Sequence, residues 1–288
     1  DACARLLADD SLDPALIERK ILQKRRFTWL KRQITADEAE RVRALGSKDG
    51  LGGKPVRGMV VEGEGRRYYP RRELAGPLLG FVAPDGEGKD GFEYSMNQEL
   101  KGHVLFAEGV QDEQALAGHN VELTLDQGIQ FAAERELAHA ARTFEAAGGS
   151  VIVVDPWTGE ILAAASWPGY NPNDYGDSEP AQRRDRGMND AFEPGSTIKM
   201  FTIAAGLSAG VITADQKLFC EKGMMPVDNV VIRDTHPSGW LTVAQVLAIS
   251  SNICSAKVGL GLGGDKLYET LLRFGFGQES GVPLPGEA

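Results

Sequence analysis

The sequence predicts a mixed α/β fold of the α+β kind, arranged as two domains. One observation is a pair of apolar runs, residues 149–155 and 160–165, which flank a Pro- and Gly-containing turn signal and are typical of a β-hairpin. Another is the recurrence of apolar residues at helical spacing after Pro194-Gly195. The third is a change near Gly118, where a charged, loop-rich sequence gives way to alternating apolar residues. We therefore expect two domains that meet near Gly118.

Length and composition are those of a globular protein with two domains, which we place at residues 1–117 and 118–288. The chain has 288 residues, of which 42% are hydrophobic and 25% charged. Its formal net charge of -10 argues against nucleic acid as a partner, because phosphate binding needs a basic surface. No apolar run is long enough to span a bilayer, and the chain begins at Asp1 without a signal peptide. We therefore expect an excised fragment.

The N-terminal domain is expected to be a scaffold. Its sequence indicates helices over residues 13–25 and 36–42 and short strands over residues 59–62 and 78–82. The basic run over residues 25–32 contains aromatic residues, but the acids around it favour a solvated surface over a nucleic-acid site. This part of the sequence holds no acid–base pair and no nucleophile with a partner.

The second domain has stronger local signals. Asp126 can cap a helix that reaches Ala141, and Thr242 and Gln245 have the spacing of a capping box for a helix that runs to Ile249. The other elements expected here are a strand over 121–125, the hairpin, a polar loop over 170–189, a largely buried helix that begins at Ser196, and a helix over 265–274.

Cysteine and histidine are sparse. The residues are Cys3, Cys220, Cys254, His103, His119, His139 and His236. They form no Cys-x-x-Cys pair and no pattern with metal-ligand spacing. The odd cysteine count supports neither a disulfide framework nor a zinc site, so we expect free, partly buried thiols.

The first candidate for chemistry is Ser196, which is followed three residues later by Lys199 in a Ser-x-x-Lys sequence. Residues three apart lie on one face of a helix, so the Lys199 amine is expected beside the Ser196 hydroxyl. A serine hydroxyl becomes a nucleophile when a base removes its proton, and a lysine amine can do this where burial lowers its pKa. The helix start adds N–H groups and a partial positive charge, which suit an oxyanion at the attacked carbonyl.

Ser196 has a plain alternative, because serine near a helix start is often only a cap. Two facts favour catalysis. Ser-x-x-Lys occurs once in the chain, and Lys199 lies among apolar residues. A charge there costs free energy unless it is paired or has a catalytic role. His236 is a rival base for a Ser-His arrangement, but it precedes Pro237 in an expected loop and Lys199 already stands next to Ser196.

A second motif, Ser250-Ser251-Asn252, follows the helix that ends at Ile249, and such polar residues favour helix ends. A Ser-x-x-Lys helix followed by Ser-x-Asn at a helix end resembles the penicillin-binding proteins and serine β-lactamases. Ser95-Met96-Asn97 has the same spacing, but it precedes Ser196 in a polar stretch and is discarded. The run Gly259–Gly264 has the spacing of a dinucleotide-binding fingerprint, which needs a strand ahead of it, and a helix is expected there instead.

Further stretches resemble class B penicillin-binding proteins, and among these the cell-division transpeptidase most. Those similar to its pedestal, or dimerisation, domain are Trp29-Leu30-Lys31-Arg32, Arg67-Tyr68-Tyr69-Pro70, Leu79-Gly80-Phe81-Val82 and Gly91-Phe92-Glu93. Those similar to its transpeptidase domain are the hairpin with its Ser166-Trp167-Pro168 exit and residues 219–223 and 232–236. The resemblance implies a pedestal domain before a penicillin-binding-protein/serine β-lactamase-like domain. The third motif of the superfamily, Lys-Thr-Gly or Lys-Ser-Gly, is absent, so we expect the catalytic domain to be incomplete.

The resemblance implies a peptidoglycan D,D-transpeptidase that acts in septal cell-wall synthesis. By this resemblance Ser196 would attack the D-Ala–D-Ala carbonyl, with Lys199 as general base. Ser250 would relay a proton to the leaving amine, and Asn252 would hydrogen-bond the substrate amide. β-Lactams would acylate Ser196, and no metal or organic cofactor is implied.

The implied partners are peptidoglycan stem peptides, a membrane-embedded glycosyltransferase and other cell-division proteins. The implied location is the bacterial inner membrane, with the catalytic domain on the periplasmic side and the anchor absent from this chain. Two other classes stay open. One is a D,D-carboxypeptidase or β-lactamase-type hydrolase, against which the long N-terminal domain argues, and the other is a non-catalytic β-lactam sensor or scaffold.

Two expectations concern the structure directly. The side chains of Ser196, Lys199 and Ser250 should converge within hydrogen-bond reach, or somewhat more loosely because the site is unfinished. The chain alone should leave Ile198, Phe201 and Leu207 short of packing partners, and we expect it to be inactive by itself.

Overall fold

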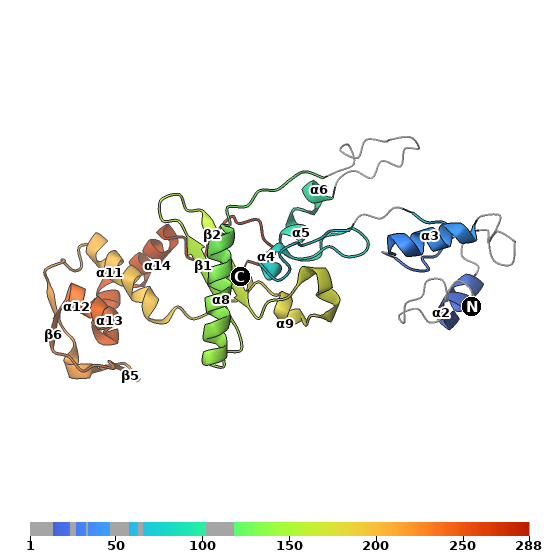
Figure 1. The fold of residues 1–288 in the computed structure, drawn as a ribbon. Helices are drawn as coiled ribbons and strands as arrows, with labels where there is room; N and C mark the ends of the chain where they lie inside the picture. The colour runs from blue at the N-terminus through green and yellow to red at the C-terminus, as the bar shows by residue number, and fades with distance from the viewer. Residues whose placement is uncertain are drawn as a thin grey trace. The chain divides into compact units, whose positions relative to one another are not determined.

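The computed structural model of the chain describes residues 14–23, 27–32, 34–46, 58–62, 66–101 and 118–287. Figure 1 traces their helices and strands. The chain divides into two compact units, which we call unit 1 (Asp1–Asn189 and Pro283–Gly286) and unit 2 (Asp190–Val282 and Glu287–Ala288). The domain boundary expected near Gly118 adjoins residues 102–117, which lie outside the described part, so a division at that point stays a prediction.

Unit 1 begins with helix α2, Pro14–Leu22, and helix α3, Ala36–Leu45, and both expected helices are confirmed. Thr35 starts α3 with a capping box, because its hydroxyl accepts from the N–H of Glu38 while the Glu38 carboxylate accepts from the N–H of Thr35. The same carboxylate pairs with the Lys31 ammonium at 2.7 Å. The start of α3 is therefore fixed by local side-chain contacts.

The strand expected over residues 59–62 is wrong. A strand needs a hydrogen-bonded neighbour, and these residues are irregular in the structure. Met59 and Val61 pack instead against Val42 of α3. Their apolar character reflects contact with a helix and not a position in a sheet.

The strand expected over residues 78–82 is also wrong, because helix α4, Gly76–Leu79, contains the first two of them. Pro77 favours a helix start, where its missing N–H would have no partner in any case. Gly80 ends α4 with a φ of 78°, and a Cβ at this position would clash with the carbonyl oxygen of Asp90. Apolar residues thus formed a short helix that a glycine terminates.

A buried polar network holds the next segment. Glu93 lies on helix α5, Gly91–Ser95, which is followed by helix α6, Asn97–Leu100. The Glu93 carboxylate accepts from the Tyr69 hydroxyl at 3.2 Å and pairs with Arg67 at 2.8 Å. Two of the stretches on which the pedestal resemblance rests are therefore in direct contact.

Helix α8, Gln127–Thr143, lies against the antiparallel hairpin of β1, Gly149–Val154, and β2, Ile161–Trp167 (Figure 1). Asp126 caps α8 as expected, since its carboxylate accepts from the N–H of Ile129. Small side chains let the helix approach the hairpin; they are Ala133, Ala163 and Ala165. The hairpin and its covering helix are both confirmed.

The strand expected over residues 121–125 is wrong. The segment runs beside β2, but Thr124 donates its side-chain hydroxyl to the Ile161 carbonyl, and no regular backbone ladder forms. The polar loop expected over residues 170–189 contains three short helices. These are η2, Pro172–Asp177, α9, Pro180–Arg183, and α10, Arg186–Asn189.

Unit 2 combines four main helices with two small antiparallel sheets. Its elements are η3, Gly195–Thr197, α11, Ile198–Ser208, β3, Lys217–Phe219, η4, Glu221–Gly223, β4, Met224–Val227, β5, Val230–Arg233, β6, Trp240–Thr242, α12, Val243–Ala248, α13, Asn252–Leu262, and α14, Gly264–Arg273. β3 pairs with β6, and β4 pairs with β5. The capping box of Thr242 and Gln245 forms as expected at the start of α12.

The core of unit 2 is built where α11 packs against α13, with α12 beside them (Figure 1). Its most buried members include Ile203, Val246, Ile253 and Val258. The expectation for Phe201 is wrong, because its ring packs edge-on against two aromatic rings of residues 274 and 276, with centroids 5.0 and 4.9 Å away. Leu207 is 40% exposed, in line with the expectation for it.

The expectation of free thiols is wrong for two of the three cysteines. Cys220 and Cys254 form a disulfide, and both are fully buried. Cys220 follows β3, and Cys254 lies in the first turn of α13. Thirty-four residues separate the two along the sequence, so the pairing depends on how β3 and α13 pack and could not be deduced from spacing. Cys3 lies outside the described residues.

The glycine run Gly259–Gly264 lies at the end of α13 and the start of α14, as expected, and it follows a helix instead of a strand. The dinucleotide-binding interpretation therefore lacks its structural context. Among the helices that the structure describes, none combines the length and the apolar character that a membrane crossing requires.

Candidate active site

The candidate nucleophile Ser196 lies in η3, immediately before α11. Pro194 and Gly195 turn the chain into this helix, and Gly195 has a φ of 57°, a conformation that glycine adopts without steric cost. The Ser196 side chain is exposed, and its hydroxyl makes no hydrogen bond within the described part of the chain. Ser196 is thus open to an incoming carbonyl group.

Lys199 is the only charged residue of α11, and only 9% of it is exposed. Its ammonium nitrogen Nζ donates to the Ser250 carbonyl oxygen at 2.6 Å and to the Ser250 hydroxyl oxygen at 2.9 Å. Burial lowers the pKa of Lys199 below its usual value, and the negative charge of Asp234 opposes that shift. A larger fraction of the amine is therefore neutral at a given pH than for a lysine in water.

Ser250 closes α12 in a strained backbone conformation. Its φ is 59°, in the left-handed region that glycine or asparagine usually fills at this point after a helix. The N–H groups of Ser250 and Ser251 donate to the carbonyls of Leu247 and Val246, which are the paired bonds of a Schellman motif. The turn directs both the carbonyl and the hydroxyl of Ser250 to the Lys199 ammonium.

Asn252 is the first residue of α13. Its side-chain Nδ2 donates to the Arg233 carbonyl at 2.7 Å, and its backbone N–H donates to the Asp234 carboxylate at 2.5 Å. The end of β5 therefore holds Asn252 in place, two residues from the Lys199–Ser250 contact.

The structure joins some of the expected site residues by hydrogen bonds and leaves the Ser196 hydroxyl without one among the described residues. Lys199 and Ser250 are in direct contact, and Asn252 adjoins them through the turn. Within the described residues, no hydrogen bond joins the Ser196 hydroxyl to Lys199 or Ser250. Ser196 and Lys199 are three residues apart where η3 passes into α11, and only the second of them is hydrogen-bonded to Ser250.

No role was assigned from the sequence to two residues of this site, Asp234 and Ser251. Asp234 accepts hydrogen bonds from the Ser251 hydroxyl and from the first two backbone N–H groups of α13. Ser251 is 1% exposed and caps α13 by accepting from the N–H of Cys254. The capping role of Ser251 could have been found from its position before a helix, but its link to Asp234, 17 residues earlier, depends on the fold.

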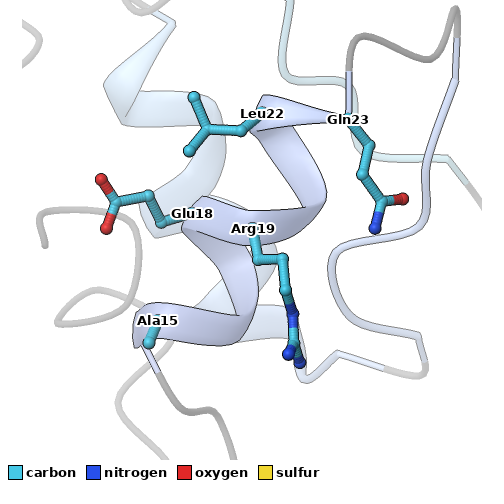
Figure 2. Close-up of a pocket in the computed structure, with 5 residues that line it drawn as sticks. All are labelled: Ala15, Glu18, Arg19, Leu22 and Gln23. Atoms are coloured by element: carbon cyan, nitrogen blue, oxygen red, sulfur yellow. The ribbon is translucent and has the colours of Figure 1, made fainter.

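A hollow elsewhere in the described structure lacks such an arrangement. Figure 2 shows a shallow hollow lined by Ala15, Glu18, Arg19, Leu22 and Gln23. These side chains all come from α2 and the residue after it, and they include no nucleophile beside a base. The described residues contain no cluster of three or more His, Cys, Asp or Glu suited to a metal ion.

Comparison with known proteins places this site in a family. Residues 149–288 match the family described as "Penicillin binding protein transpeptidase domain". The probable peptidoglycan D,D-transpeptidase PbpC of Pseudomonas aeruginosa is 35% identical over 279 residues, which cover 91% of this chain and 47% of that protein. The peptidoglycan D,D-transpeptidase FtsI of Escherichia coli is 32% identical over 277 residues, which cover 92% of this chain and 45% of that protein.

Solved structures give the same result. Penicillin-binding protein 3 from Mycobacterium tuberculosis superposes with a TM-score of 0.67 at 31% identity, over 77% of this chain and 49% of that chain. The same protein has been solved in complex with ampicillin. The chain spans about half the length of the relatives that it matches. Residues 149–288 therefore belong to the penicillin-binding-protein transpeptidase family, and the chain as a whole is similar to its class B, FtsI-like members.

Proposed function

We propose that this chain belongs to a peptidoglycan D,D-transpeptidase, which cross-links stem peptides through an acyl-enzyme on Ser196. The observation that carries this proposal is the contact of the buried Lys199 ammonium with Ser250, one turn away from an unbonded Ser196 hydroxyl. A nucleophile, a base and a proton relay within one site are the parts that acyl transfer requires. The names of the relatives point to the same reaction.

In the first half of the reaction Ser196 Oγ bonds to the carbonyl carbon of the penultimate D-Ala. The amide bond to the terminal D-Ala breaks, and that residue leaves with the proton that Ser196 gave up. Lys199 accepts this proton as general base, because its lowered pKa makes the neutral amine available. Ser250 passes the proton to the leaving amine, since its hydroxyl is hydrogen-bonded to Lys199 Nζ.

In the second half an amine from a neighbouring stem peptide attacks the ester on Ser196. A new amide bond forms, the ester bond breaks, and Ser196 Oγ takes up the proton that the attacking amine loses. Asn252 hydrogen-bonds an amide of the bound peptide through its side chain, which the Arg233 carbonyl orients. A β-lactam enters the first half in place of the peptide and leaves Ser196 acylated.

The proposal extends to the organisation of the chain and its surroundings. Residues 1–117 are proposed as a pedestal domain and residues 118–288 as part of the transpeptidase domain, on the strength of the motifs in each. The enzyme is proposed to act in septal cell-wall synthesis with a membrane-embedded glycosyltransferase and other cell-division proteins. Its catalytic domain would face the periplasm from the inner membrane. We propose that activity needs the chain to continue through a Lys-Thr-Gly motif, since the chain covers only about half of each relative.

A peptide-transfer assay tests this proposal on a version of the chain extended through that motif. A stem peptide ending in D-Ala–D-Ala is supplied with a D-amino acid as acceptor, and mass spectrometry follows the products. Release of D-Ala together with a product that carries the acceptor supports a transpeptidase. Release of D-Ala with hydrolysed peptide alone indicates a carboxypeptidase, and no release indicates a sensor or scaffold.

The assay has a matched pair of controls on one helix. Ser196→Ala is expected to abolish release, because no ester can form. Ser208→Ala changes an exposed serine at the end of α11 and is expected to leave release unchanged. Loss of release in both variants would contradict the assignment of Ser196.

A further inference from the structure

The carboxylate of Asp234 binds the second motif at three points. Oδ2 accepts from the Ser251 hydroxyl at 2.6 Å, and Oδ1 accepts from the backbone N–H groups of Asn252 and Ile253 at 2.5 and 3.0 Å. Asp234 follows directly after β5, Val230–Arg233. One residue at a strand end therefore holds the middle of the motif and the start of the helix behind it.

These bonds supply partners for the backbone N–H groups at the start of α13. The first N–H groups of a helix have no partner within it, and an acidic group there is stabilised by the helix dipole. The N–H groups of Asn252 and Ile253 bond to Asp234, and that of Cys254 bonds to Ser251. The Ser251 hydroxyl thus acts as a bridge, because it accepts from α13 and donates to Asp234.

The same turn carries Ser250, whose left-handed φ of 59° needs support from its surroundings. The Schellman hydrogen bonds to α12 hold Ser250 on its N-terminal side. The hydrogen bond from the Ser251 hydroxyl to Asp234 holds it on its C-terminal side. A turn that is fixed at both ends keeps the Ser250 hydroxyl on Lys199 Nζ. The Arg233 carbonyl, next to Asp234, also holds the Asn252 side chain.

We propose that Asp234 is a positioning residue, which fixes Ser250 against Lys199 and Asn252 toward the bound peptide by anchoring the turn between them. The inference rests on the proposed function, in which these residues serve acyl transfer. Asp234 touches neither the reacting atoms nor Ser196 in the described structure, so it acts through the turn. Misplacing a catalytic group by about 1 Å can lower a rate by about 10²-fold, which is enough to detect easily.

Four variants of the extended protein separate position from charge. Asp234→Ala removes the anchor. Asp234→Asn keeps an oxygen that can accept from the two N–H groups but removes the charge, and Asp234→Glu keeps the charge but displaces the oxygens by one methylene. Asp228→Asn is the matched control, because Asp228 is an exposed acid in the turn of the same β4–β5 hairpin.

The measurement is the first-order rate of Ser196 acylation by a fluorescent penicillin, resolved from its initial binding by varying the penicillin concentration. We expect this rate to fall about 10–100-fold in the Ala and Glu variants. At the pH where the rate of the Asn variant levels off, that rate should be within a few-fold of the rate of the parent, which is the extended protein without substitutions. Asp228→Asn should match the parent. Melting temperatures establish that each variant is folded.

The acylation rate of the folded variants decides between the outcomes. A folded Ala variant that acylates at the parental rate overturns the proposal, and if that variant does not fold, a Glu variant at the parental rate overturns it equally. Should the parent itself fail to acylate, the proposed function fails, and crystal structures of parent and Ala variant then decide the inference. A longer Lys199 Nζ to Ser250 Oγ distance in the variant supports it, and an unchanged distance overturns it.

Discussion

The Nζ atom of Lys199 lies 2.9 Å from the hydroxyl oxygen of Ser250, although 51 positions separate the two residues in the sequence. One comes from the first turn of α11 and the other from the strained turn after α12. The same nitrogen also binds the Ser250 carbonyl, so a single buried amine ties the two motifs together. The stability of this turn and the reactivity of the amine should therefore be coupled, and they can be measured separately.

Replacing Ser250 should separate stability from activity. Ser250→Gly removes the cost of a left-handed conformation, about 1–2 kcal/mol for a residue with a Cβ, together with the hydroxyl. Ser250→Ala removes the hydroxyl but keeps that cost. We expect the Gly variant to be more stable than the Ala variant by about 1 kcal/mol, measured by urea unfolding. Both should acylate far more slowly than the parent.

Equal stabilities of the two Ser250 variants would show that the left-handed turn is not a source of strain. Acylation at the parental rate in either variant would remove the proton-relay role from the Ser250 hydroxyl. The two results are independent, because one is read from unfolding and the other from labelling.

The acylation rate should depend on pH through Lys199. In the proposed reaction the neutral amine is the active form, and burial lowers the pKa of Lys199 below the usual range of a lysine. The rate should therefore rise with pH and level off below the pH at which a solvated lysine would titrate. Asp234 acts in the opposite direction, so Asp234→Asn should move the midpoint of the rise to lower pH.

Few other charges lie on the elements around Lys199. Helices α11 and α12 and the η3 turn contribute none, and Lys257 of α13 is bound to Glu221 and the Phe219 carbonyl. Arg233 lies on β5, and α14 carries Asp265, Lys266, Glu269 and Arg273, but only Asp234 shifts the pKa of Lys199 noticeably. A midpoint that is identical in the parent and in Asp234→Asn would contradict this account, and Asp228→Asn serves as the control for a general change in surface charge.

The Cys220–Cys254 disulfide should contribute to the stability of unit 2. It closes a 34-residue separation, for which the chain-entropy estimate is about 3–4 kcal/mol. Replacing both cysteines by alanine should lower the free energy of unfolding by an amount of that order, measured in urea without reductant. Adding a reductant should destabilise the parent and leave the double variant unchanged. A parent that is insensitive to reductant under unfolding conditions would contradict the pairing.

Asp185 should destabilise the protein at neutral pH. Burial raises the pKa of its carboxyl, and its Oδ2 atom has no hydrogen-bond partner in the described structure. Its Oδ1 atom accepts from the Ser166 hydroxyl and from the Gly187 N–H, and an asparagine oxygen could keep both bonds. Asp185→Asn should therefore raise the melting temperature at pH 7 by a few degrees.

The sign of this effect follows from the direction of the shift. A carboxyl whose folded pKa is raised favours the folded state at low pH, and this contribution is lost as pH rises above the unfolded value of about 3.9. The gain from Asp185→Asn should accordingly be larger at pH 7 than at pH 4, as followed by thermal unfolding at both values. A gain that is equal at the two pH values, or a loss at pH 7, would exclude a charged buried carboxylate.

Local signals in the sequence were sufficient for much of the fold. Asp126, Thr35 and the Thr242–Gln245 pair act through hydrogen bonds that span only three residues, so their helices could be placed from the sequence. The hairpin of β1 and β2 was also predictable, because both strands and the turn are contiguous. The three isolated strands failed for the opposite reason, since a strand depends on a neighbour that its own residues do not specify.

The site shows the same limit. Ser196, Lys199, Ser250 and Asn252 could be chosen because their spacings resemble known motifs. The bond between Ser251 and Asp234 and the disulfide between Cys220 and Cys254 join segments 17 and 34 residues apart, and no local pattern announces either contact. These long-range contacts hold the motifs in place, and they depend on how the segments around β5 and α13 pack in the folded structure.

The most direct test of the central claim is to locate the covalent adduct of a penicillin on the extended protein. The protein is labelled, digested and analysed by mass spectrometry, in parallel with Ser196→Ala and with Ser208→Ala as the matched serine on α11. The account predicts one adduct, on the peptide that contains Ser196, present in the parent and in Ser208→Ala and absent from Ser196→Ala. An adduct on another residue, or undiminished labelling of Ser196→Ala, would contradict it.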